Sequence, residues 1–146
     1  GKHILLIQGH PDAGQRHLCH ALEDAYARGA SAAGHEIRRI DVATLDFPLL
    51  RSQHEWEQGE LPPNLAPAQD AINGLSTWLF FPLWLRDMPA LLKGFLEQVA
   101  PPGFAFSQEA KNPLAAKALS DRSARVVVSM GMLMALRRKM ENAPRT

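Results

Sequence analysis

Residues 4–14 read Ile-Leu-Leu-Ile-Gln-Gly-His-Pro-Asp-Ala-Gly, and this stretch decides the fold. The apolar run 4–7 contains no polar residue, which predicts a strand buried on both faces, as in a parallel sheet. The turn-forming residues that follow end the strand. A helix is predicted next and ends at Gly34, because apolar residues recur at helical spacing at Leu18, Ala21, Leu22 and Ala25.

Three further short apolar runs predict strands within residues 36–42, 75–81 and 125–130. A helix is predicted at about 66–73, and a short basic helix at 133–146. An apolar stripe predicts another helix, with Pro89 near its first turn. The stripe is Met88, Leu91, Leu92, Phe95, Leu96 and Val99.

The order β-α-β-α-β-α-β predicts an α/β fold with a doubly wound, open parallel sheet, in a single domain over residues 1–146. Two segments, 44–66 and 101–123, interrupt the alternation as excursions. The first is too apolar at Phe47 and Trp56 to lie free in water, which favours an interface between two copies of the chain.

Composition excludes several classes of protein. The chain has 16 Lys+Arg and 15 Asp+Glu, a net charge of +1, which argues against a nucleic-acid binder. Its single cysteine, Cys19, excludes an internal disulfide and is expected to be a small core residue. No apolar run is long enough to span a membrane and no signal peptide is visible, so a soluble, cytoplasmic protein is expected.

Ligands of doubly wound sheets bind outside the carboxyl ends of the strands, here residues 8–17, 82–87 and 129–132. The first of these loops leads into a helix N-terminus, and it is either a phosphate site or a plain structural turn. The apolar segment 82–85 is either a slot for a flat aromatic ligand or a cap on the sheet. His10, His17 and His20 lack the further ligands expected of a zinc site, so no metal is predicted.

Several motifs in order resemble the flavodoxin-fold NAD(P)H quinone oxidoreductases, a family that includes ancillary subunits of glutathione-gated potassium-efflux systems. The resemblance covers about residues 3–132. It is carried by the sequences at 10–12, 17–22, 34–37, 45–47, 81–84, 88–95 and 102–106.

The resemblance implies a bound flavin, FAD or FMN, and a homodimer. It implies hydride transfer from NAD(P)H to the flavin and then to a quinone, with no catalytic side chain. By position, the residues that match the family's phosphate loop are His10, Arg16, His17 and Leu18. The segment along the flavin ring is matched by Pro82, Leu83, Trp84 and Leu85, and the second loop at the flavin edge by Ser129, Met130, Gly131 and Met132. The wall where nicotinamide and quinone alternate is matched by Phe104 and Phe106.

The sequence departs from the family pattern at three places. Arg86 and Leu133 stand where relatives usually have glycine and proline, and the family's fifth strand is missing or replaced. These departures leave a second interpretation open, a non-enzymatic flavodoxin-fold regulatory or interaction subunit of the potassium-efflux type with weak or no flavin.

Overall fold

A parallel sheet forms the centre of the protein, whose computed structural model describes residues 1–100, 105–106 and 123–129. Its strands are β1 (His3–Gln8), β2 (Glu36–Asp41), β3 (Ser76–Pro82), β4 (Ala105–Phe106) and β5 (Ser123–Ser129). They lie in the order β2-β1-β3-β5-β4, and every pairing is parallel. The open, doubly wound α/β sheet expected from the sequence is confirmed.

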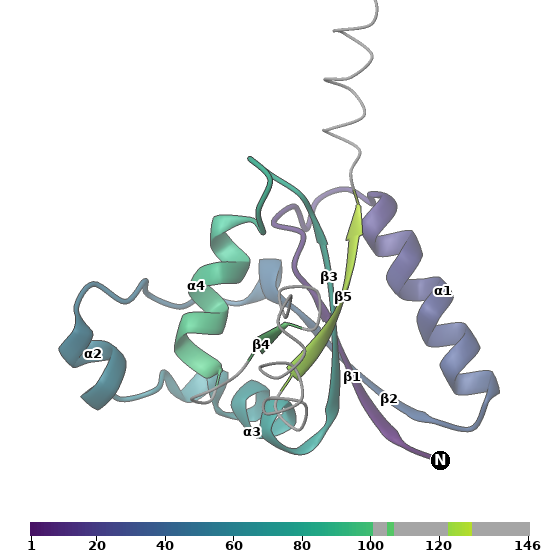
Figure 1. Cartoon of the computed structure of the whole chain (residues 1–146), viewed down its shortest axis with the longest axis horizontal. Coiled ribbons are helices and arrows are strands. Elements are labelled where there is room, and N and C mark those ends of the chain that lie inside the picture. Colours follow the sequence, from purple (N-terminus) through teal and green to yellow (C-terminus); the bar gives the residue numbers. More distant parts are fainter. Residues whose placement is uncertain (101–104, 107–122, 130–146) are drawn as a thin grey trace, which may run out of the picture.

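Helices cover both faces of this sheet (Figure 1). Helix α1 (Leu18–Ala32) lies on one face, and α3 (Ala66–Gly74) and α4 (Ala90–Val99) lie on the other. Alternate residues of β1 point to opposite faces. Leu5 and Ile7 therefore join the core beneath α3 and α4, whereas Ile4 and Leu6 join the core beneath α1.

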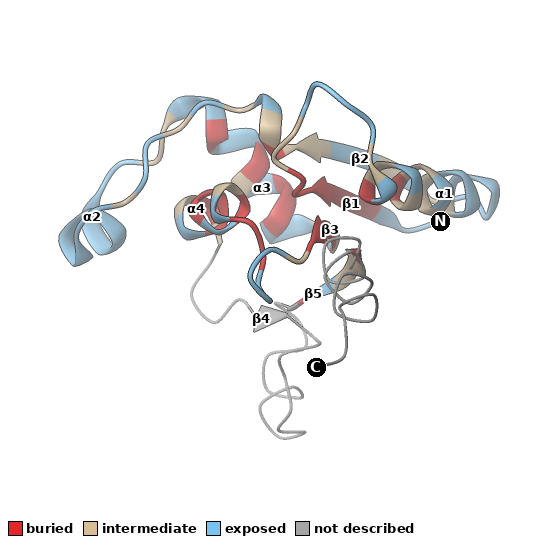
Figure 2. Ribbon diagram, turned by 90° about the horizontal axis from the view of Figure 1, so that it is seen from above, coloured by how far each residue is buried: buried red, intermediate tan, exposed pale blue. Residues whose placement is uncertain are grey.

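The buried residues gather around β1, β3 and the inner side of α4 (Figure 2). The apolar stripe predicted for α4 is confirmed, because Leu92, Phe95, Leu96 and Val99 are all buried. The helix begins at Ala90, and Pro89 is its N-cap, next to the first turn as predicted.

The face predicted for α1 is wrong, except at Leu22. Leu18, Ala21 and Ala25 are exposed, and the residues facing the sheet are Cys19, Leu22, Glu23, Tyr26, Ala27 and Ala30. The prediction failed because the buried face includes a charged residue, Glu23, which breaks the apolar pattern.

The first excursion and the residues just before it contain short helical turns that the sequence pattern did not reveal. They are η1 (Val42–Thr44), α2 (Gln53–Gln58) and η2 (Pro63–Leu65). Helix α2 has no buried residue and extends away from the sheet (Figures 1 and 2). The chain leading to it is fixed on α4, because the Gln98 side chain donates to the Pro48 carbonyl at 2.9 Å.

The outer position of the sheet is occupied by β4, which pairs with Ser123 and Ala124 of β5. A two-residue strand from an earlier part of the chain thus stands where a full strand was expected to be missing or replaced. The predicted helix at 133–146 lies outside the described residues. Within the described part, no helix has the length and apolar character needed to cross a membrane.

Candidate functional site

The carboxyl ends of β1, β3 and β5 are joined by hydrogen bonds. The backbone N–H of Gly9 donates to the Phe80 carbonyl at 2.7 Å, and that of Leu83 donates to the Ser129 carbonyl at 2.9 Å. The Cys19 thiol at the start of α1 donates to the Ser129 hydroxyl at 3.1 Å. The structure therefore brings together all three strand ends that the sequence marked as candidates.

Three imidazoles gather at the start of α1, and we call His10, His17 and His20 the histidine cluster. The His10 ring stacks on that of His17 with centroids 4.1 Å apart, and its centroid lies 5.3 Å from that of His20. The ring centroid of Trp84 lies 5.9 Å from that of His10, and the two rings are nearly perpendicular. The loop after β1 and the loop after β3 thus meet through a pair of aromatic rings.

His17 is the N-cap of α1, and its backbone N–H donates to Nδ1 of His20 at 2.9 Å. Its ring nitrogen Nε2 lies 2.8 Å from Oδ2 of Asp12. The backbone N–H groups of Leu18 and Cys19 have no hydrogen-bond acceptor in the described part of the chain. Unpaired N–H groups and the helix dipole make this end of α1 attractive to an anion.

The titratable groups of this loop respond to burial and to each other. Burial lowers the pKa of His10, and the neighbouring His17 and His20 lower it further. The hydrogen bond from His17, with that from the Gly14 N–H, lowers the pKa of Asp12. Burial raises the pKa of the Cys19 thiol. The loop therefore favours a neutral His10 and an ionised Asp12.

After β3 the chain makes a tight turn at Leu85 and Arg86. The backbones of Trp84 and Asp87 exchange hydrogen bonds of 2.9 and 3.1 Å across it. Leu85 and Arg86 have φ of 52° and 64°, the left-handed region at both central positions, as in a type I′ turn. This geometry suits glycine at the position of Arg86, and Arg adopts it at a cost.

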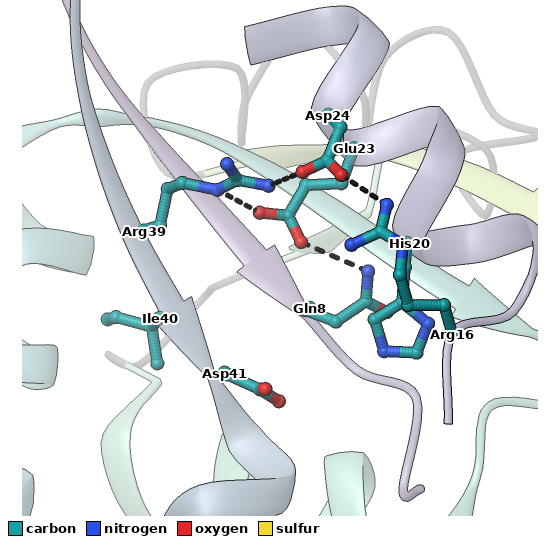
Figure 3. A pocket seen from close by; sticks show the side chains of 8 residues that line it. All are labelled: Gln8, Arg16, His20, Glu23, Asp24, Arg39, Ile40 and Asp41. Carbon is teal, nitrogen blue, oxygen red and sulfur yellow. Dashed lines mark hydrogen bonds and ion pairs between the residues drawn. The ribbon is translucent and has the colours of Figure 1, made fainter. Parts of the chain in front are cut away.

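A hollow of about 280 Å³ lies between α1 and the end of β2 (Figure 3). Arg39 bridges Glu23 and Asp24 there, and Arg16 pairs with Asp24. Glu23 is buried and accepts from the Gln8 side chain at 3.0 Å. The hollow is lined by Gln8, Arg16, His20, Glu23, Asp24, Arg39, Ile40 and Asp41.

The network in this hollow also holds the first loop. The Gln8 side chain donates to Glu23 and to the Cys19 carbonyl, and its Oε1 accepts from the His10 N–H at 3.0 Å. Because all its polar atoms are engaged, Gln8 fixes where the chain leaves β1. Glu23, Gln8 and Asp12 are the functional residues that sequence reasoning missed; a glutamate on the inner face of an amphipathic helix is the signal that would have indicated this network.

Of the residues predicted to line the site, His10, His17, Trp84, Leu83 and Ser129 lie together at the carboxyl edge of the sheet. Arg16 points instead into the hollow beside Asp24. Phe106 lies in β4, and Phe104, Met130, Gly131 and Met132 lie outside the described residues. Pro82 ends β3 and is buried, whereas Leu18 and Leu85 are exposed.

A glycine in the loop after β1 can serve close approach of a ligand to the backbone, but the structure shows a different role for Gly9. A Cβ at Gly9 would lie 2.5 Å from Cδ2 of Leu92 on α4. The absence of a Cβ at Gly9 therefore leaves space for the Leu92 side chain in the core. No group of three or more His, Cys, Asp or Glu side chains in the described ranges is arranged to hold a metal ion.

The residues present fit a flavin in two respects. Unpaired N–H groups at the start of α1 suit its phosphate. Trp84 and Leu85 are 39% and 93% exposed at the carboxyl edge of the sheet, where a flat apolar ring would cover them. Arg16 suits a flavin phosphate less well, because its positive charge is paired with the Asp24 carboxylate.

Comparison with known proteins agrees with this architecture. The chain matches the family described as having a flavodoxin-like fold over residues 2–144. A comparison with curated proteins finds no match.

Solved structures share the fold at low sequence identity. An NAD(P)H:quinone oxidoreductase from Methanothermobacter marburgensis is 21% identical, with a TM-score of 0.62 over 97% of this chain and 98% of that one. A protein described as a quinone reductase from Klebsiella pneumoniae is 27% identical, with a TM-score of 0.54 over 71% of this chain and 47% of that one. An NADH:FMN oxidoreductase in its apo form is 20% identical, with a TM-score of 0.56 over 94% of this chain and 80% of that one.

The family match covers nearly the whole chain, and the observed strand order and helix layers agree with it. The protein therefore belongs to the family with the flavodoxin-like fold.

Proposed function

We propose that the protein is a flavin-dependent oxidoreductase that passes a hydride from NAD(P)H, by way of bound FAD or FMN, to a quinone or a similar small acceptor. The observation that carries this proposal is the meeting of three strand ends around exposed Trp84 and Leu85, beside the unpaired N–H groups of α1. A flavin nucleotide requires donors for its phosphate beside an apolar surface for its ring, and this arrangement supports such a site.

In this proposal the described residues bind and orient the cofactor, which itself supplies the hydride chemistry when bound. The N-terminus of α1, with His10 and His17, holds the phosphate. The backbone of Pro82–Leu85 lies along the edge of the ring, and Ser129 fixes that segment through its bond to Leu83. The resemblance to the family assigns ring contacts to Met130, Gly131 and Met132, and the nicotinamide and quinone wall to Phe104 and Phe106.

The names of the structural relatives support the same class of reaction. Two are called quinone oxidoreductase or quinone reductase, and a third is an NADH:FMN oxidoreductase. All three names describe a redox enzyme, and all three proteins share this fold. The proposal extends that reaction to this chain together with its flavin and its nicotinamide donor.

The protein is further proposed to act as a homodimer. Phe47, predicted to lie at this interface, packs instead against Phe95 of α4 in the core of its own chain. Trp56 and Leu49 remain 65% and 56% exposed, and both lie in the excursion between β2 and α3. Large apolar side chains at this exposure favour burial against another surface. A second copy of the chain is the occupant that the family resemblance implies.

A second candidate function is favoured by the charges of the first loop. The ionised Asp12 occupies the neighbourhood of the proposed phosphate, and Arg16 is paired with Asp24. Both features weaken attraction for a phosphate. They support a regulatory or interaction subunit of the same fold with weak or no flavin.

A titration with FMN, FAD and riboflavin separates the two candidates. The enzyme is expected to bind at least one flavin nucleotide and to oxidise NADH or NADPH when a simple quinone is present. His17→Asp adds a carboxylate at the phosphate and is expected to weaken nucleotide binding by about 1–3 kcal/mol. His54→Asp, on the exposed helix α2, is the matched control and leaves it unchanged. Absence of flavin binding in the unaltered chain would overturn the proposal and leave the regulatory subunit.

A further inference from the structure

The turn after β3 holds two residues in a backbone conformation that their side chains disfavour. Leu85 and Arg86 follow one another with φ of 52° and 64°, in the left-handed region that favours glycine or asparagine. Both side chains are exposed, so burial in the core does not compensate the strain. Strained positions of this kind are concentrated at ligand-binding sites. The turn is therefore a place to look for contact with a ligand.

The backbone of this turn is fixed to the rest of the sheet edge. Trp84 and Asp87 exchange two hydrogen bonds across it, and the N–H of Leu83 donates to the carbonyl of Ser129 just before it. The ring centroid of Trp84 lies 5.9 Å from that of His10. The segment between β3 and α4 projects beyond the carboxyl edge of the sheet (Figure 1). The tip of the turn thus has a defined place next to the proposed position of the flavin ring.

Arg86 brings a positive charge to this tip. In the part of the chain that the structure describes, no carboxylate forms an ion pair with it. Its neighbour Asp87 instead accepts the backbone N–H of Met88 through Oδ1, at 2.7 Å. The two arginines of the hollow, by contrast, are both paired with Asp24. The guanidinium of Arg86 is therefore available to an anionic group from outside the chain, and its planar fork suits a carboxylate or a sulfonate.

The surface beside this charge is apolar. Leu85, the preceding residue, is 93% exposed, and Trp84 is 39% exposed. An apolar surface next to an unpaired cation fits a flat aromatic molecule whose acidic group is attached directly to its ring. The 2′-phosphate of NADPH suits this spacing less well, because two riboses and a pyrophosphate separate it from the nicotinamide.

We propose that Arg86 selects the electron acceptor, by binding the carboxylate or sulfonate of an aromatic quinone that enters the ring site beside Leu85. This inference rests on the proposed function, because it concerns the acceptor of that reaction. Overall, the quinone gains a hydride from NAD(P)H and a proton from solvent, and the products are NAD(P)⁺ and the hydroquinone. Arg86 takes part in none of these bond changes and acts only on specificity.

The test compares two quinones that differ in one charged group, 1,4-naphthoquinone and 1,4-naphthoquinone-2-sulfonate, with flavin-loaded protein and NADH. Arg86→Asn is the main variant, because asparagine tolerates positive φ and removes the guanidinium without straining the turn. The ratio of kcat/KM for the sulfonate to that for the neutral quinone should be about fivefold lower in this variant. The quinones' different reduction potentials cancel, since the variant and the unaltered protein receive the same pair.

Three further measurements separate charge from other effects. Arg86→Lys keeps the charge and should lower the ratio by no more than about twofold. Arg51→Asn, at an exposed arginine in the first excursion, is the matched control and should leave the ratio unchanged. Naphthalene-2-sulfonate, which has no quinone to reduce, should bind about fivefold less tightly to Arg86→Asn than to the unaltered protein in equilibrium dialysis.

An unchanged ratio in Arg86→Asn, or an equal fall in Arg51→Asn, would overturn the inference while leaving the proposed function standing. The same protein samples are also assayed with NADPH in place of NADH. A lower preference for NADPH in Arg86→Asn with an unchanged quinone ratio would assign Arg86 to the phosphate of the donor, and would also overturn the inference. If flavin-loaded protein reduces neither quinone, the proposed function itself fails and the inference fails with it.

Discussion

The backbone N–H of Leu83 lies 2.9 Å from the carbonyl oxygen of Ser129. This bond continues the β3–β5 ladder one residue beyond Pro82, the last residue of β3. It sets the position from which Trp84 and the tight turn leave the sheet. The two loops proposed to border the flavin ring thus have one shared anchor.

Removing this donor tests the anchor. Leu83→Pro lacks the N–H and leaves the buried carbonyl of Ser129 unsatisfied, whereas Leu83→Ala keeps the bond. The proline variant is expected to lower the free energy of unfolding by about 1–3 kcal/mol more than the alanine variant, as measured by urea denaturation. Equal losses in the two variants would mean that the bond does not hold the loop.

The turn at Leu85 and Arg86 is expected to gain stability from residues that suit its backbone. Leu85→Asn with Arg86→Gly places Asn-Gly in a turn with positive φ at both positions, and should raise the free energy of unfolding by about 1–2 kcal/mol. Arg51→Gly, another exposed arginine without positive φ, serves as the control and should not stabilise. A loss of stability in the double variant would show that its side chains contribute more than the backbone strain removes.

Arg39 is expected to contribute more to the free energy of unfolding than its neighbour Arg38. Arg39→Ala removes the ion partner of Glu23, whose side chain is only 6% exposed, so the carboxylate keeps only its bond from Gln8. Arg39 itself is 45% exposed, and water therefore compensates part of the loss. A decrease of about 1–2 kcal/mol in the free energy of unfolding is expected. Arg38→Ala should change it by less than about 0.5 kcal/mol.

His10 should make the protein less stable in mild acid. Its pKa is lowered in the folded state, so the unfolded chain binds more protons as the pH falls below the ordinary pKa of 6.5. Stability should therefore fall from pH 7 towards pH 5.5. His10→Asn keeps an acceptor for the Asp12 N–H without a titrating ring, and should reduce this loss, whereas His54→Asn should not. Thermal unfolding at several pH values provides the measurement, and identical pH profiles for all three proteins would contradict it.

The proposed dimer can be tested at Trp56. Trp56→Lys places a charge on the exposed helix α2 and should shift the sedimentation coefficient from dimer to monomer at micromolar concentration. Leu85→Lys introduces the same charge at an exposed apolar residue outside the excursion and should leave the assembly intact. A monomer in the unaltered protein would remove the proposal.

The sequence predicted most clearly the elements whose buried positions are all apolar. Strands β1, β3 and β5 and helix α4 were found because their buried positions carry no charge. The buried face of α1 was missed because Glu23 lies on it, and its burial depends on Arg39 from β2, far away in the sequence. Helix α2 was missed because all its residues are exposed, leaving only Ser52 as a capping signal.

The site was predicted in outline for the same reason. Chain order alone places the ends of β1, β3 and β5 at one edge of a doubly wound sheet, so His10, Trp84 and Ser129 could be grouped in advance. The roles of Asp12, Gln8 and His20 depend on side-chain directions in a loop, which no periodicity describes. The turn at Leu85 was hidden because Leu-Arg is not a turn-forming pair.

The bond between Cys19 and Ser129 joins residues 110 positions apart. Contacts of such long sequence separation form late in folding, because closing the intervening loop costs entropy before any contact is gained. During synthesis, β1, β2 and β3 leave the ribosome well before Ser129 does. The neighbouring strands can pair early, but the anchor for the loop after β3 is missing until β5 arrives. Assembly of the site, and any cofactor loading that depends on it, therefore belongs to the final stage of folding.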